Sequence, residues 1–182
     1  MSYQPGWKDG REVGIGQRDA SGRYETIRRE LRGHGRFSVL DVGAYSGYFS
    51  IRLAEEFEAN VIAADDFPAL ARLQAPGVTV IPRRLTGDEL SRLLFAGVDV
   101  TLLLSVLHHV TWWRDMLTLA VERSRVVFVE VPDVREHLPG AVAHAETPNM
   151  HAAIQEAGGI VIGRHAGYDH RYDRPLYVIG QM

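Results

Sequence analysis

The sequence contains no cysteine, and Lys8 is the only lysine among its 20 basic residues. Without cysteine the chain has no disulfide bonds, zinc–thiolate sites or cysteine nucleophiles. No apolar run reaches the roughly 18 residues that a membrane-spanning helix needs, and the first residues lack the apolar core of a secretory signal. We therefore expect a cytoplasmic protein, and we attribute the excess of arginine over lysine to coding bias.

The remaining composition is typical of one globular domain. The 182 residues are 46% hydrophobic and 24% charged, and 23 acidic against 20 basic side chains give a net charge of −3. A chain of this length buries about 70% of the surface that its unfolded form exposes, which is enough for an ordinary core. The net charge argues against non-specific binding of nucleic acid but leaves room for a local basic patch.

Short apolar runs alternate with amphipathic stretches from Phe37 onward, which predicts parallel strands joined by crossover helices. Residues 1–36 form a more polar N-terminal segment, and 37–182 form the main domain. The last two apolar runs have no helix between them, so the loop 166–174 is expected to join an antiparallel hairpin. The predicted strands are 37–42, 60–64, 78–81, 98–104, 125–131, 160–164 and 175–180, and the predicted helices include 22–31, 48–57 and 149–157, the last capped by Asn149.

The first predicted strand runs into a glycine-bearing turn and then a helix, in the sequence VLDVGAYSG that ends at Gly47. This arrangement places backbone N–H groups and a helix N-terminus against a ligand. A dinucleotide fingerprint needs a second glycine where Tyr45 stands, so the turn is a poor cradle for a pyrophosphate. This argues against a nicotinamide cofactor and favours a ligand without phosphate.

The second predicted strand ends in VIAADD, with Asp65 22 residues after Gly43. An acidic residue about 20 residues beyond the turn, at the tip of the neighbouring strand, is where a ribose diol is accepted. The alternative is purely structural: the glycines shape a tight turn, and Asp65 and Asp66 form a solvated strand end.

With these features the chain resembles the class I S-adenosylmethionine-dependent methyltransferases. The resemblance covers about four fifths of the chain, from residue 37 to the C-terminus, and also includes the segments VDVTLLLSVLHHV and RVVFVEVP and the closing hairpin. It implies an α/β fold: a Rossmann-like, doubly wound, seven-stranded sheet in three αβα layers, with the last strand antiparallel and inserted between the fifth and sixth. It also implies S-adenosylmethionine as cofactor, across the carboxyl ends of the first, second and fourth strands.

The resemblance further implies roles for individual residues. Gly43 and Gly47 would let the backbone pass close to the cofactor, Asp41 would bond the turn or the methionine ammonium, and Asp65, or less readily Asp66, would take the ribose hydroxyls. The predicted cofactor-binding residues are Asp41, Gly43, Ala44, Tyr45, Gly47, Asp65, Asp66, Leu85, Ser105 and Val106.

The chain departs from the family pattern at two positions, Tyr45 and Arg84. Tyr45 replaces a small residue and would either stack over the cofactor or shape the substrate mouth. After the third strand Arg84 stands where the family often has an acid, so adenine would be held by backbone near Leu85 and by apolar packing. Ser105 and Val106 would line the floor near the methionine moiety.

Methyl transfer from a sulfonium is an in-line displacement, and a base is needed only if the acceptor keeps its proton. His108 and His109 follow the fourth strand at the edge where a ligand crevice forms, and they are the leading candidates. Their alternative is a hydrogen-bonding role that caps the next helix. Glu130, a carboxylate in an otherwise apolar strand, is the next candidate, and Asp133 is a weaker one.

Three further histidines, His137, His144 and His151, recur at seven-residue intervals. Pro139 and Pro148 interrupt any continuous helix between them, so the interval does not place the three on one face. No metal site is predicted.

The predicted function is methyl transfer to an oxygen, or less readily a nitrogen, of a small molecule or sugar. No D-P-P-Y sequence follows the fourth strand, so DNA is not expected as acceptor, and no membrane is expected as partner. RNA is the alternative, suggested by the arginines at positions 28, 29, 32 and 36. A catalytically silent binding or regulatory subunit is the other alternative. Acceptor choice would rest on 1–36, 132–148 and 166–174, and a homodimer is one way to close so sparsely covered a site.

Overall fold

The computed structural model describes residues 2–138, 140–168 and 170–182. The chain divides into two compact units, Met1–Leu85 and Thr86–Met182, which we describe in turn. No helix in the described part of the chain is both long and apolar enough to cross a membrane.

Seven strands form one mixed sheet in the order β5-β4-β3-β6-β7-β9-β8. Neighbours within β3–β5 are parallel, as are β6 and β7, whereas β9 runs antiparallel to both β7 and β8. This is the predicted Rossmann-like sheet with an inserted antiparallel last strand. The bounds are β3 (Ser38–Val42), β4 (Asn60–Ala64), β5 (Val78–Ile81), β6 (Val98–Leu104), β7 (Ser124–Glu130), β8 (Ile160–Ala166) and β9 (Asp173–Gly180).

The first unit contains two helices, α1 (Ala20–Glu30) and α2 (Tyr48–Phe57), and a short 3-10 turn, η1 (Leu70–Arg72). The Asp19 carboxylate caps α1 by accepting the Gly22 N–H at 2.8 Å. The predicted apolar face of this helix is buried, because Tyr24 and Ile27 are fully covered. Helix α2 packs on β3, β4 and β5 and coincides with the predicted 48–57.

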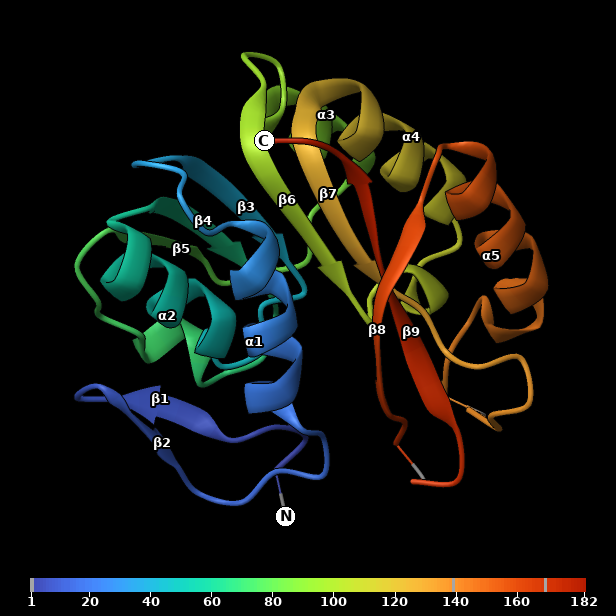
Figure 1. Cartoon of the computed structure of the whole chain (residues 1–182), viewed down its shortest axis with the longest axis horizontal. Helices are drawn as coiled ribbons and strands as arrows, with labels where there is room; N and C mark the ends of the chain where they lie inside the picture. Colours follow the sequence, from blue (N-terminus) through green and yellow to red (C-terminus); the bar gives the residue numbers. More distant parts are fainter. Residues whose placement is uncertain (1, 139, 169) are drawn as a thin grey trace. The chain divides into compact units, whose positions relative to one another are not determined.

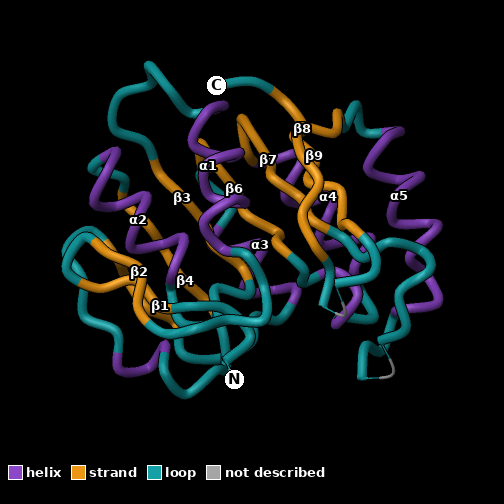
Figure 2. Tube along the Cα trace, turned by 60° about the horizontal axis from the view of Figure 1, so that its bottom comes forward, coloured by secondary structure: helices purple, strands orange, loops and turns teal. Residues whose placement is uncertain are grey.

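The N-terminal segment contains a β-hairpin that the sequence reasoning missed, β1 (Gly6–Lys8) and β2 (Arg11–Val13), beside α2 (Figures 1 and 2). The dipeptide Asp9-Gly10 forms its two-residue turn and was the available signal. The hairpin is anchored on α2 by side chains: Trp7 Nε1 donates to Glu55 at 2.7 Å, and the Arg52 guanidinium lies 4.3 Å from the Trp7 ring centre.

The second unit contains α3 (Gly87–Leu93), α4 (Trp113–Arg123) and α5 (Thr147–Glu156), with short 3-10 turns η2 (Leu107–His109) and η3 (His144–Glu146). Strands β6 and β7 are buried over most of their length and form the core against which α4 packs. The predicted Asn149 cap is wrong. Helix α5 begins at Thr147 with Glu146 at the N-cap, because Pro148 suits the first helical turn, and Asn149 donates back to Glu146 at 3.0 Å.

Candidate functional site

The Asp65 carboxylate holds together the turn that follows β3. Its Oδ2 accepts the Tyr45 N–H and its Oδ1 accepts the Phe67 N–H, both at 2.8 Å. An ionised carboxylate has about four acceptor positions, and these two bonds use one on each oxygen. Asp65 therefore shapes the turn while keeping the acceptor capacity that a diol needs, so this residue fits the ribose of an adenosyl group.

An aromatic stack lies beside this carboxylate. The rings of Tyr45 and Phe67 are 3.8 Å apart and nearly parallel, and Tyr3 meets Tyr45 edge-on at 5.5 Å. The Tyr3 N–H also points to the Tyr45 hydroxyl at 3.4 Å. Sequence reasoning singled out Tyr45 but missed both partners. Phe67 was signalled only by its place directly after the Asp65-Asp66 pair, and nothing in the sequence indicated Tyr3.

Asp41 is buried on β3, and its carboxylate accepts the Ser50 hydroxyl of α2 at 2.6 Å. Burial raises the pKa of Asp41 to about 7, with the nearby Asp65 charge acting in the same direction and the Ser50 bond opposing it. Gly47, where α2 begins, has φ +81°, and a Cβ there would lie 2.6 Å from Leu73 Cδ2. Turn shape and packing thus suffice to explain Gly47, as the structural alternative proposed.

The remaining predicted residues of this unit, Ala44, Asp66 and Leu85, follow β3, β4 and β5 respectively. Arg84 Nε lies 2.7 Å from Asp66 Oδ2 in an exposed ion pair, so the arginine that departs from the family pattern meets the second aspartate. Leu85 is buried, and Ala44 donates to the Ala64 carbonyl at 3.2 Å. Of the two aspartates, Asp65 is the one directed to the turn.

The second unit presents a different cluster at the end of β6. Ser105 has a left-handed φ of 62°, unusual for a residue with a side chain, and its N–H donates to the Glu130 carbonyl at 2.9 Å. Its hydroxyl donates to the Glu130 carboxylate and accepts from Arg174 Nη1 at 3.1 Å. The structure thus brings together Ser105 and Glu130, two residues predicted for different roles. No pattern in the sequence singled out Arg174.

The two candidate histidines follow in η2, after the half-buried Val106. Their rings lie 4.2 Å apart, yet His108 is buried and His109 is exposed. A base must reach an acceptor, so exposure favours His109 over His108 and over Glu130, which is fully buried.

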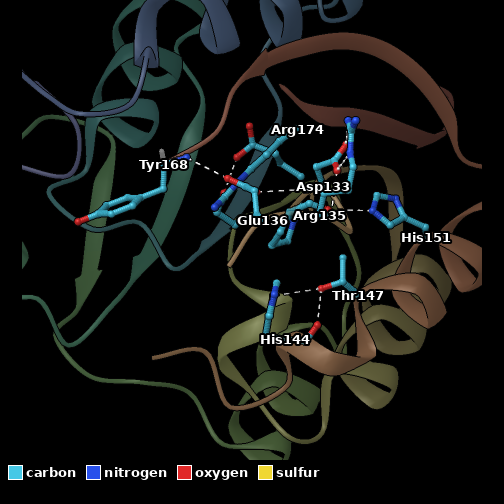
Figure 3. A network of polar contacts seen from close by, with 11 residues as sticks. Asp133, Arg135, Glu136, His144, Thr147, His151, Tyr168 and Arg174 are labelled. Atoms are coloured by element: carbon cyan, nitrogen blue, oxygen red, sulfur yellow. Dashed lines mark hydrogen bonds and ion pairs between the residues drawn. The ribbon is translucent and has the colours of Figure 1, made fainter. Parts of the chain in front are cut away.

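Asp133 is paired with Arg135 through two side-chain contacts, Nε to Oδ1 at 2.7 Å and Nη2 to Oδ2 at 3.0 Å (Figure 3). The Arg135 hydrogen bond lowers the pKa of Asp133 to about 2. A carboxylate so acidic is a poor proton acceptor at neutral pH, which weakens Asp133 further as a candidate base.

The evenly spaced histidines have separate partners in the fold. His144 Nδ1 lies 3.5 Å from Thr147 Oγ1, whereas His151 contacts the Tyr177 hydroxyl at 2.8 Å and the Pro132 carbonyl at 2.9 Å (Figure 3). Within residues 2–138, 140–168 and 170–182, no three His, Cys, Asp or Glu side chains gather in a group that could hold a metal ion.

The arginines of the N-terminal basic cluster make contacts within the first unit. Arg28 pairs with Glu56, Arg29 Nε donates to the Glu25 carbonyl at 3.1 Å, and Arg36 Nε donates to the Glu58 carbonyl at 3.0 Å. These contacts fit the exposed-helix interpretation of the cluster better than a phosphate-binding patch.

No protein-family model matches the sequence, and no curated protein matches it either. Solved structures do. WbdD, a bifunctional kinase-methyltransferase, matches with TM-score 0.71 and 20% identity over 92% of this chain and 41% of WbdD, so the chain spans about two fifths of that protein. The N-terminal domain of EvdMO1, crystallised in the presence of SAH (S-adenosylhomocysteine) and D-fucose, matches with TM-score 0.67 and 14% identity over 100% of this chain and 91% of that one.

Magnesium protoporphyrin IX methyltransferase (ChlM) from Synechocystis PCC 6803, with bound SAH, matches with TM-score 0.64 and 15% identity over 88% of this chain and 83% of that one. At such identities the likeness concerns the fold. Together with the sheet order and the inserted antiparallel strand, these matches show that the chain has the fold of the class I S-adenosylmethionine-dependent methyltransferases.

Proposed function

We propose that the protein is an S-adenosylmethionine-dependent methyltransferase that acts on an oxygen, or less readily a nitrogen, of a small molecule or sugar. The observation that carries this proposal is the Asp65 turn, in which the carboxylate bonds the Tyr45 and Phe67 amides at 2.8 Å and keeps acceptor capacity for a ribose diol. Two structures of the same fold carry SAH.

In this proposal the cofactor supplies an electrophilic methyl group, and the chain supplies position. Asp65 takes the ribose hydroxyls, and the Tyr45–Phe67 stack offers apolar surface beside them. Asp41, Gly43, Ala44 and Gly47 shape the turn. Because an in-line displacement depends mainly on alignment, such positioning accounts for much of the rate.

The proposed cofactor-binding set also includes Ser105, Val106, Asp66 and Leu85. These residues would contribute to binding the cofactor and would take no part in the methyl transfer itself. Val106 and Ser105 would line the methionine end, and backbone near Leu85 would hold adenine. Arg84 engages Asp66 at 2.7 Å, which supports the assignment of the ribose to Asp65.

For the acceptor, support comes from three observations. A protein of the same fold was crystallised with D-fucose, the net charge of −3 disfavours a polyanion, and the arginines of α1 already have intramolecular contacts. Residues 1–36 are proposed as part of the acceptor cover, because Tyr3 reaches Tyr45. If the acceptor keeps a proton, His109 is the proposed base, since it is exposed at the end of η2.

The proposal is tested by incubating the protein with S-adenosylmethionine and a panel of free sugars and hydroxylated small molecules, and measuring S-adenosylhomocysteine. We expect turnover with at least one acceptor, lost or reduced in His109→Gln while cofactor binding is unchanged. His137→Gln, at an exposed position, is the matched control. Absence of cofactor binding at millimolar concentration would overturn the proposal.

One observation favours a second function, a binding or regulatory subunit of the same fold. Among the candidate bases, His108 and Glu130 are buried and Asp133 is paired with Arg135, which leaves His109 as the exposed candidate. A protein that binds cofactor but forms no S-adenosylhomocysteine with any extract of its source would fit this alternative.

A further inference from the structure

Arg174, on β9, is a buried charged residue with two partners from distant parts of the second unit. Its side chain is 2% exposed, its Nε lies 2.6 Å from Glu136 Oε2, and its Nη1 lies 3.1 Å from Ser105 Oγ (Figure 3 shows the Glu136 side). One guanidinium therefore connects the turn after β6 with the segment after β7.

Glu136 extends this connection to a third segment. Besides Arg174, its carboxylate accepts the Asp133 N–H at 3.1 Å and the Tyr168 N–H of the β8–β9 loop at 3.0 Å (Figure 3). The loop comes so close that a Cβ on Gly167 would lie 2.1 Å from Glu136 Oε1. The loop backbone thus rests directly on the carboxylate, at a residue without a side chain.

Burial of these charges costs free energy, and a hydrophobic contact between the hairpin and the sheet would stabilise the fold at least as much. The advantage of the charged pair is that it fixes the orientation of the segments that it joins. The planar guanidinium has donors in a fixed fork and serves two acceptors on different segments at once, which the single ammonium of lysine does less well. Ser105 has φ 62°, and its hydroxyl bonds both Arg174 and Glu130. Through this hydroxyl, Arg174 contacts the turn that leads to His108 and His109.

We propose that Arg174 and Glu136 are positioning residues that couple the acceptor-side segments 133–136 and 167–168 to the Ser105 turn. The effect on the cofactor rests on the proposed function, because Ser105 is a proposed cofactor residue. A change at Glu136 is transmitted to the turn through Arg174, which contacts both Glu136 and Ser105. Ordering of these two segments when an acceptor binds would thereby change the shape of the Ser105 turn, which is proposed to line the methionine moiety of the cofactor.

The test compares Glu136→Gln with wild type in two measurements. Glutamine keeps the shape and an acceptor for the Tyr168 amide but removes the charge that Arg174 meets. Hydrogen exchange of the amides from 105 to 109 should become about tenfold faster, because loss of a charge-assisted bond lowers the cost of local opening. Affinity for S-adenosylhomocysteine, measured by calorimetry, should fall by about threefold or more. Glu122→Gln, at an exposed position of α4, is the matched control.

Arg174→Lys keeps the charge and is expected to give the same two changes, with Arg164→Lys on exposed β8 as its control. If Glu136→Gln speeds exchange only in 133–136 and 167–168 and leaves 105–109 and the affinity unchanged, the coupling is refuted. If wild type itself does not bind S-adenosylhomocysteine, the proposed function fails. The exchange at 105–109 then still decides whether Glu136 and Arg174 position the turn.

Discussion

The two units hold their candidate residues in opposite ways. In the first, Asp65 is partly exposed and bonds two amides that lie within 20 residues of it, at Tyr45 and Phe67. In the second, Ser105 and Glu130 are buried and tied through Arg174 to Glu136, over a separation of 69 residues from Ser105 to Arg174. The first is a local motif in which one carboxylate bonds two nearby amides, whereas the second is a buried network that joins residues far apart in the sequence.

The largest effect is expected from breaking the long-range network. Arg174→Met removes the guanidinium and leaves the Glu136 carboxylate, itself 3% exposed, without its charge partner. Loss of one member of a buried pair typically costs about 3–5 kcal/mol of unfolding free energy. Urea denaturation measures the change. Arg164→Met, at an exposed position of β8, should cost far less. An equal loss of stability in both variants would contradict a stabilising role of the buried contacts of Arg174.

Asp41 allows the same comparison in the first unit through pH. Its pKa in the fold is raised from 3.8 to about 7, so the folded protein keeps a proton that the unfolded chain releases between about pH 4 and 7. Its contribution to stability therefore falls as the pH rises through this window and is lowest above pH 7. Asp41→Asn removes the slope, so the variant should gain on wild type by up to about 4 kcal/mol between pH 4 and 8.

Urea denaturation of both proteins at pH 4, 6 and 8 checks this expectation. Asparagine can still accept the Ser50 hydroxyl, so the comparison isolates the charge. A difference between the two proteins that does not change with pH would contradict the buried, protonated state of Asp41.

A change in the aromatic stack of the first unit tests how much the rings, in addition to the Asp65 carboxylate, contribute to cofactor affinity. Phe67→Ala removes the ring on which Tyr45 lies at 3.8 Å, and aromatic pairs contribute about 1 kcal/mol beyond burial. Affinity for S-adenosylhomocysteine should fall about fivefold, as measured by calorimetry. Phe95→Ala, at a 79% exposed position of the second unit, should leave the affinity unchanged.

The smallest effect is expected from the ion pair at the edge of the network. Arg135→Ala removes the partner of Asp133, whose lowered pKa of about 2 supplies stability that is present above pH 4 and lost as the pH falls toward 2. Because Arg135 is exposed, the unfolding midpoint at pH 7 should change much less than in Arg174→Met. If Arg135→Ala lost as much stability as Arg174→Met, the buried network would not stabilise the second unit more than this surface ion pair does.

The same contrast between local and long-range contacts explains what the sequence could predict. The strands, the turn at VLDVGAYSG and the spacing to Asp65 are local patterns, and the sheet follows them within one or two residues at most ends. The β1–β2 hairpin was readable from Asp9-Gly10 but lies in a segment whose apolar periodicity is weak. The cap of α5 was misplaced because Pro148 was taken as a helix breaker, although proline suits a first turn.

The second unit's network was not predictable in the same way. Glu130 stood out as a carboxylate in an apolar strand, and this was the correct signal for a buried polar contact. Its partners carried no such signal. Arg174 is one of 19 arginines and Glu136 lies in a polar loop, and only the antiparallel return of β9 beside β7 brings them together. Burial of a charge depends on topology, which local spacing does not encode.

A paired calorimetric titration tests most directly our proposal that the Asp65 turn binds the adenosyl ribose. S-adenosylhomocysteine is titrated into wild type, Asp65→Asn and Asp66→Asn at pH 7. We expect binding to wild type, a loss of affinity of about tenfold or more in Asp65→Asn, where one carboxylate acceptor is replaced by a donor, and little change in Asp66→Asn. Equal affinities of the two variants, or no binding to wild type, would contradict it.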